Sequence, residues 1–144
     1  MEIKIALALN QNEFFDNRYF GEAEMFVVFR FNGEKFLREE TLQNPYKAIS
    51  GKTNHEIKIK GEGIVDFLRK KNVSVIISTQ FGRNIRMVNK YFIPVIVSGE
   101  EPERVINLLL KYLHWIKDEI QNKPDRYKLF TINKGILKTT IDQK

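Results

Sequence analysis

The sequence predicts an α/β fold that is built around buried parallel strands. Strands covered on both faces are almost wholly apolar, and three runs have this composition: residues 3–9, 73–78 and 93–97. Helical spacing of apolar side chains occurs in residues 64–70 and 85–92. Because strands and helices alternate here, we expect βαβ units with parallel strands and right-handed crossovers.

An antiparallel hairpin is predicted before these units. Residues 25–31 and 35–42 are strand-like runs on either side of Asn32-Gly33, which is the strongest short signal for a hairpin turn. Asn44-Pro45 ends the second run, because proline donates no hydrogen bond to a strand ladder.

Two connections predict no regular element. Residues 10–23 have no apolar period and predict a long loop, and long ordered loops are often functional. A polar stretch follows the hairpin and continues to Gly63. We therefore expect the first helix to be short and to begin only after Gly63.

The last third of the chain predicts one helix and a second hairpin. Pro102 suits the first turn of a helix, and the following apolar residues lie on one side of it at about 100° per residue: Val105, Leu109, Tyr112, Leu113, Ile116 and Ile120. Residues 127–132 and 136–141 flank a turn and predict a hairpin. Because an isolated hairpin is marginal in water, we expect residues 127–142 to dock on the domain or on a second copy of the chain, with Lys134 at the exposed tip.

Composition indicates one compact domain plus a tail. The 144 residues are 42% hydrophobic, which suits a single core. No apolar run approaches the ~18 residues that span a bilayer, so we expect a soluble, cytoplasmic protein with no membrane partner. Cysteine is absent, which excludes disulfides, thiolate zinc sites and cysteine-held iron–sulfur clusters.

The net charge of +6 favours an anionic partner. Residues 119–144 hold six basic side chains against three acidic ones, so half of the excess charge lies in the tail. The rest of the chain is only mildly basic, which argues against nucleic acid as the partner.

Several motifs occur in a fixed order along the chain. They are IKIALAL at the start, RYFGEAEMFVVF after the first loop, LQNPYKA at the end of the hairpin, GEGIVDFLRKKNVSVIIS, and FGRNIRMVNKYFIPVIVSG. This order resembles the dinitrogenase iron-molybdenum cofactor-binding family, the NifX and NifB C-terminal type of domain. The features shared with the family are Phe20-Gly21 followed by Ala23, Asn44-Pro45, Gly61 with Gly63, and Gly82 after the fourth strand.

The resemblance implies a three-layer α/β/α fold of the ribonuclease H-like kind, with a five-stranded mixed sheet in the order 3-2-1-4-5 and strand 2 antiparallel. Residues 1–117 would form this domain, and residues 118–144 would be a C-terminal extension with its own hairpin. Many family members have a histidine directly before the Phe-Gly pair. This chain has Tyr19 there, so it lacks that imidazole ligand.

This strand order places a ligand site beyond the C-terminal ends of strands 1 and 4, where the outgoing connections diverge. Residues 10–21, 60–63 and 79–84 would meet there and offer cations, close backbone approach and apolar walls to an anionic metal cluster or a phosphate-bearing ligand. The candidate residues are Asn10, Arg18, Tyr19, Phe20, Gly21, Lys60, Gly61, Gly63, Gln80, Phe81, Gly82 and Arg83. Ordinary turns with solvated charges are the alternative interpretation.

The two histidines form no metal motif of recognised spacing. His55 follows a polar stretch and is the candidate imidazole ligand for a metal near the crevice, with an ordinary surface histidine as the alternative. His114 falls about 180° from Val105 on its helix and is expected in solvent.

Catalytic functions find little support in the sequence. A ribonuclease H-type nuclease needs a carboxylate on its first strand, and residues 3–9 contain none. Glu13, Asp16 and Glu22 lie in the first loop, where solvated or capping contacts explain them. There is no Gly-x-Ser-x-Gly, P-loop or His-Glu-x-x-His, and the single Gly-x-Gly at residues 61–63 lacks the third glycine of a dinucleotide fingerprint.

The sequence therefore predicts a binding protein and not an enzyme. The main hypothesis is a carrier that holds an iron-molybdenum or iron–sulfur type cofactor, or a precursor, without cysteine ligands, with cluster-assembly proteins as partners. The alternative is a regulatory or interaction protein of the same fold that has lost cofactor binding. A hydrolase of phosphate esters is a third class, with Asp16 as the residue to test.

Overall fold

A mixed sheet of seven strands forms the centre of the computed structural model, which describes residues 2–49 and 52–140. The strand order is β3-β2-β1-β4-β5-β6-β7. Strands β1, β4, β5 and β6 run parallel, while β2 is antiparallel to both β1 and β3, and β7 is antiparallel to β6. The strands are β1 (Lys4–Leu9), β2 (Met25–Phe31), β3 (Phe36–Gln43), β4 (Val75–Ser78), β5 (Ile93–Ser98), β6 (Leu129–Asn133) and β7 (Ile136–Thr140).

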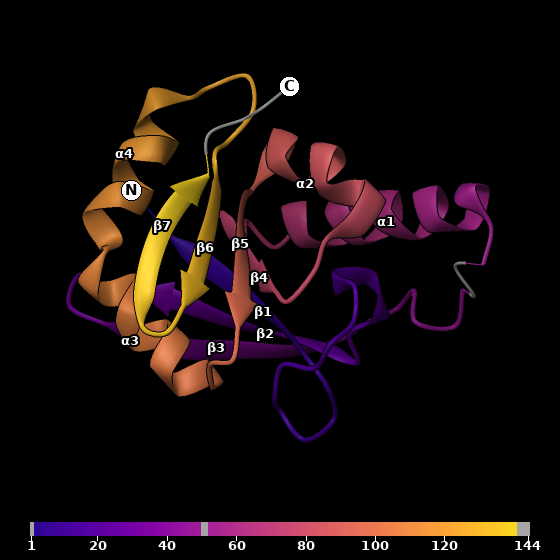
Figure 1. The fold of residues 1–144 in the computed structure, drawn as a ribbon, viewed down its shortest axis with the longest axis horizontal. Coiled ribbons are helices and arrows are strands. Elements are labelled where there is room, and N and C mark those ends of the chain that lie inside the picture. The colour runs from indigo at the N-terminus through magenta and orange to yellow at the C-terminus, as the bar shows by residue number, and fades with distance from the viewer. Residues whose placement is uncertain (1, 50–51, 141–144) are drawn as a thin grey trace.

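Helices cover both faces of this sheet (Figure 1). In the described residues they are α1 (Asn54–Arg69), α2 (Ile85–Tyr91), α3 (Pro102–Lys111) and α4 (Leu113–Asn122), with short 3₁₀ helices η1 (Phe20–Glu22) and η2 (Gly82–Asn84). Because successive strand side chains point to opposite faces, Leu7 of β1 packs in the core under α3 and α4, and Ala6 packs in the core under α1 and α2. The fold therefore has three layers.

The expected order of the first five strands is confirmed, as is the antiparallel hairpin of β2 and β3. The expected limit of five strands is wrong. The C-terminal hairpin does not lie on the surface of a finished sheet; it extends the sheet, with β6 pairing parallel to β5 from Val95–Phe130 to Ser98–Asn133. The likeness to ribonuclease H in particular stays a prediction.

The C-terminal hairpin docks on its own domain, one of the two outcomes that the sequence left open. Phe130, Ile132 and Leu137 are buried in the core beneath α3 and α4, and Lys134 lies exposed at the turn, as expected. These buried side chains offset the cost of ordering the hairpin. Residues 141 and 142 of the expected hairpin lie outside the described residues.

Helix α1 begins at Asn54, well before the expected start after Gly63. The reason is a capping box: the Thr53 side chain accepts the Glu56 N–H, and the Glu56 carboxylate accepts the Thr53 N–H. Gly61 and Gly63 therefore lie inside the helix. A Cβ added at Gly61 would lie 2.6 Å from the Asn84 side chain, so this glycine lets a neighbour pack against the helix.

The single helix expected from Pro102 to Ile120 is two helices. The chain breaks at Tyr112, whose φ of −103° and ψ of 22° depart from helical values. Both helices keep an apolar side on the sheet, because Leu109 of α3 and Ile116 of α4 are buried in the same core. The bend lets the pair follow a twisted surface. His114 is exposed, as expected.

Candidate functional site

The connections that leave β1 and β4 are joined beyond the C-terminal ends of these strands. The Phe20 N–H donates to the Gln80 carbonyl at 2.8 Å, beside an isolated parallel bridge between Tyr19 and Gln80. The Thr79 hydroxyl donates to the Asp16 carbonyl at 2.6 Å. Two of the three segments expected at the switch point therefore meet, and α1 supplies the third from the side.

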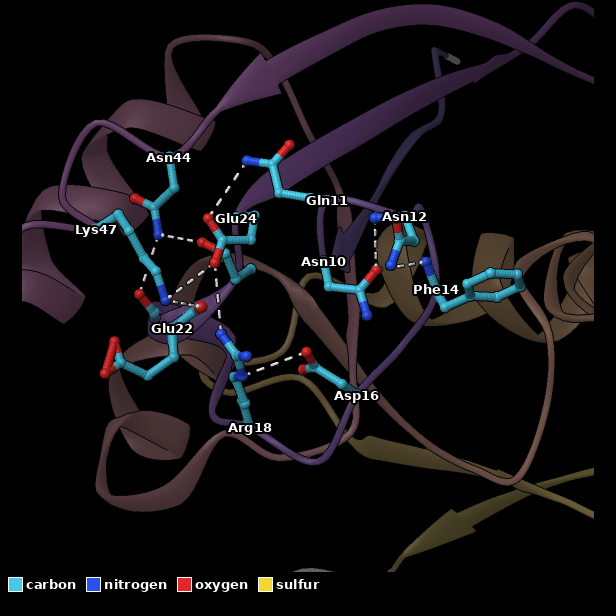
Figure 2. Close-up of polar contacts among 12 residues, drawn as sticks. Asn10, Gln11, Asn12, Phe14, Asp16, Arg18, Glu22, Glu24, Asn44 and Lys47 are labelled. Atoms are coloured by element: carbon cyan, nitrogen blue, oxygen red, sulfur yellow. Dashed lines mark hydrogen bonds and ion pairs between the residues drawn. The ribbon is translucent and has the colours of Figure 1, made fainter.

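Contacts from three side chains, those of Phe20, Asn44 and Lys47, fix the backbone of η1. Phe20 is fully buried, with its ring centroid 5.5 Å from that of Phe81. The buried Asn44 amide donates to the carbonyls of Gly21 at 3.0 Å and Ala23 at 2.9 Å, and the Lys47 ammonium donates to the Glu22 carbonyl at 2.9 Å (Figure 2). The path of the chain through η1 is fixed by these contacts.

A pocket of about 230 Å³ opens between η1, η2 and the first turns of α1. Ile57 and Phe81 give it an apolar wall, and polar or charged groups make up much of the rest. Ligand pockets for drug-sized molecules are typically about 300–1,000 Å³, so this one suits a small anion or one corner of a larger ligand. The lining residues are Tyr19, Gly21, Glu22, Lys52, Asn54, Ile57, Lys60, Phe81, Arg83 and Asn84.

Cations outnumber carboxylates in this lining: Lys52, Lys60 and Arg83 face Glu22. The Lys60 side chain is only 5% exposed, and its ammonium donates to the Glu22 carboxylate and to the Ile49 carbonyl at 2.8 Å. Arg83 is exposed and has no hydrogen-bond or ion-pair partner in the part of the chain that the structure describes. The lining therefore contains one neutralised cation, Lys60, and two exposed ones, Lys52 and Arg83.

Five of the residues chosen from the sequence line this pocket together: Tyr19, Gly21, Lys60, Phe81 and Arg83. Three other predicted residues do not line the pocket but pack next to residues that do. Phe20 is buried beneath it, Gly61 lies against Asn84, and Gly82 lies beneath the Tyr19 ring with a φ of +60°. A Cβ on Gly82 would lie 2.5 Å from that ring, so Gly82 lets Tyr19 form the wall.

Arg18 and Gln80 line an adjoining cleft of about 400 Å³, which shares Tyr19 and Glu22 with the pocket. Arg18 is engaged there by Asp16 at 3.2 Å and by Glu24 at 3.5 Å (Figure 2). Burial raises the pKa of Glu24, but the hydrogen bond from Gln11 and the charges of Lys47 and Arg18 outweigh it and leave that pKa below its usual value.

Three predicted residues lie away from the pocket. The Asn10 side chain accepts the N–H groups of Asn12 and Phe14 at 2.9 and 3.1 Å, which shapes the long loop (Figure 2). A Cβ on Gly63 would lie 2.4 Å from the Tyr46 ring, so this glycine serves packing. His55 is exposed in the first turn of α1 and is not among the lining residues.

The sequence-based choice missed half of the lining: Glu22, Lys52, Asn54, Ile57 and Asn84. One signal was available. The capping box at Thr53 and Glu56 predicts a helix start, and a helix from there places Ile57, Lys60 and Ile64 on one side at spacings of three and four.

Within the described residues, no three or more Asp, Glu or His side chains are grouped so as to hold a metal ion. No helix in that part of the chain is both long enough and apolar enough to cross a membrane.

The chain is an open α/β domain with a cationic pocket at its switch point, which is where domains of this class commonly bind their ligands. The family model described as dinitrogenase iron-molybdenum cofactor matches residues 1–112, so the chain belongs to that family. The crystal structure of a dinitrogenase-like protein from Methanocaldococcus jannaschii is similar, with a TM-score of 0.54 and 18% sequence identity over 78% of this chain and 91% of that one. The comparison with curated proteins found no match.

Proposed function

We propose that this protein is a non-catalytic, cytoplasmic carrier for an anionic metal cluster of the iron-molybdenum or iron–sulfur type, or for a precursor of one. Membership of the dinitrogenase iron-molybdenum cofactor family supports a role with such a cluster. The single observation that carries the proposal is the pocket at the β1–β4 switch point, whose lining has three cations against one carboxylate and whose Arg83 has no ion-pair partner among the described residues. The cluster is the cargo of this pocket.

The lining fits a cargo that brings its own metal ligands. None of the lining residues is a histidine, an aspartate or a cysteine, so sulfide or organic groups of the cluster would keep the metal and the protein would supply charge and hydrogen bonds. Arg83 offers a planar fork of donors, and the amides of Asn54 and Asn84 offer more. The N-terminus of the 16-residue helix α1 adds its partial positive charge at Asn54.

A regulatory or interaction protein of the same fold is the second candidate. The observation that favours it is the Glu22–Lys60 ion pair, which leaves the most deeply placed cation of the pocket already neutralised. In that case partner proteins would be captured equally by the wild type and by a variant with both Arg18→Ala and Arg83→Ala. Loss of those partners together with loss of the cluster would favour the carrier.

The test is anaerobic loading of the purified protein with synthetic iron–sulfur and iron-molybdenum–sulfur clusters, followed by desalting, metal analysis and visible absorption. We expect wild type to retain metal and a visible band, and Arg83→Ala to lose most of both. Arg86→Ala is the matched control, because Arg86 is exposed on the neighbouring helix α2 and does not line the pocket. Wild type that retains no metal, or an Arg83→Ala variant that retains as much as wild type, would overturn the proposal.

A further inference from the structure

We propose that the Glu22 carboxylate is a built-in occupant of the pocket, which an incoming anion displaces from Lys60. The pocket would then accept only anions that compete with a covalently attached carboxylate. This inference rests on the proposed anion-carrying function and adds to it a device that sets which anions are accepted.

Lys60 needs a negative partner at all times. Its side chain is 5% exposed, and burying an ammonium without a counter-charge is very costly. The Ile49 carbonyl is a neutral acceptor and balances no charge. Glu22 is the only carboxylate paired with Lys60 in the described residues. A ligand can therefore use Lys60 only by taking the place of Glu22, since two anions on one buried cation would repel each other.

The Glu22 side chain can move away from Lys60 without disturbing the fold. Its side chain is 36% exposed, whereas its backbone is held on both sides: the N–H donates to the Tyr19 carbonyl at 2.8 Å, and the carbonyl accepts from Lys47 at 2.9 Å. Figure 2 shows the Glu22 carboxylate pointing away from the Lys47 and Glu24 side chains. Rotation about side-chain bonds is therefore enough to move it, and η1 can stay in place.

The adjoining cleft offers a second position for the Glu22 carboxylate. Glu22 lines both the pocket and the adjoining cleft. That cleft contains Arg18 and Lys47. Glu24 lies 3.5 Å from each of them, and Arg18 also pairs with Asp16 at 3.2 Å. A displaced Glu22 carboxylate would move toward these two cations, while the ligand takes Lys60. Compact dianions should succeed better than monoanions, because the competitor that they replace carries one charge.

The experiment measures molybdate and nitrate binding to the full chain by calorimetry. Glu22→Gln removes the competing charge but keeps an oxygen that accepts from Lys60, and we expect it to bind molybdate about tenfold more tightly than wild type. The ratio of molybdate affinity to nitrate affinity should also be smaller for Glu22→Gln than for wild type. Glu62→Gln is the matched control, because Glu62 is exposed on α1 and does not line the pocket, and its affinity should equal that of wild type.

A measurement on the wild type decides the question even if Glu22→Gln folds poorly. The carboxyl ¹³C resonance of Glu22 should shift as molybdate is added, while that of the exposed Glu62 should stay in place. An unmoved Glu22 resonance, or a Glu22→Gln variant that binds no more tightly than wild type, overturns the displacement, whether or not wild type retains clusters. If Glu22→Gln binds molybdate tightly while wild type retains no cluster, the displacement stands and the carrier proposal fails.

Discussion

Two carboxylates of the long connection between β1 and β2, which includes η1, pair with cations on β3 and α1. Glu13 accepts two hydrogen bonds from the Arg38 guanidinium of β3, at 2.7 and 3.1 Å. Glu22 pairs with the Lys60 ammonium of α1. The Glu13 and Arg38 side chains are 46% and 44% exposed, whereas those of Glu22 and Lys60 are 36% and 5% exposed.

The Glu13–Arg38 pair has the better hydrogen-bond geometry, but we expect it to contribute less to stability than the Glu22–Lys60 pair. Separating the exposed Glu13–Arg38 pair costs little free energy, because water solvates both side chains once they part. Lys60 has no such alternative, since little water reaches it. Burial of one partner, and not the number of hydrogen bonds, therefore decides which pair constrains the molecule.

The largest effect should come from Glu22→Ala, which leaves the Lys60 ammonium buried without a counter-charge. We expect a loss of about 3 kcal/mol of unfolding free energy, at the low end for a broken buried pair because Glu22 is partly solvated. Urea denaturation at neutral pH measures it, with Glu62→Ala as the control for removing an exposed carboxylate. A cost no greater than that of Arg38→Ala would show that burial does not separate the two pairs.

Removing the other partner should cost less. Lys60→Met replaces the buried ammonium by an apolar side chain of similar length, and Glu22 can turn its carboxylate to water. We expect a loss of about 1 kcal/mol or less in the same denaturation experiment. The variant should also lose molybdate binding. If Lys60→Met destabilises the protein as much as Glu22→Ala does, the buried charge is not the source of the cost.

Low pH should remove the stabilising contribution of the Glu13–Arg38 pair. The hydrogen bond from Arg38 outweighs desolvation and holds the pKa of Glu13 below its usual 4.5. A carboxyl with a lowered folded pKa stabilises the fold above its unfolded pKa, and this contribution is lost as pH falls through the folded pKa. The small difference in stability between wild type and Arg38→Ala should therefore be present in full at pH 7 and shrink as the pH falls below 4.5. A difference that stays constant over this range would contradict the assignment.

Salt should have the smallest effect. Raising ionic strength from 0.1 to 1 M shortens the screening length from about 10 to about 3 Å. The stability difference between wild type and Arg38→Ala should shrink over this range, while the cost of Glu22→Ala should stay nearly unchanged. Equal sensitivity of both differences would place the two pairs in the same environment.

Much of the fold could be predicted because its signals are local. The apolar runs of β1, β4 and β5 and the Asn32-Gly33 turn were sufficient to give these strands and the hairpin, while the strand order came from the family resemblance. The start of α1 was missed because the stretch up to Gly63 is polar and contains two glycines, a composition that is typical of a loop. Each of those glycines is explained by a partner distant in sequence, Asn84 or Tyr46, whose side chain lies where a Cβ would be.

The site was predicted only where topology alone determines position. Tyr19, Gly21 and Arg83 follow strands that must end at one edge of the sheet, so the strand order brings them together. The Glu22–Lys60 pair joins residues 38 positions apart, and no local pattern marks it. The burial of Lys60 depends on a helix face that the sequence-based boundary had placed in a loop.

The C-terminal hairpin has a consequence for how the chain is made. Strand β5 ends at Ser98 and lies between β4 and β6, but β6 begins only at Leu129. A ribosome adds about 5 to 20 residues each second. The nascent sheet therefore spends seconds with β5 as an open edge, and an open edge of parallel β-structure readily pairs with other chains. During that interval α3 and α4, whose residues arrive next, can cover one face of the unfinished sheet, but the edge of β5 stays open until β6 pairs with it.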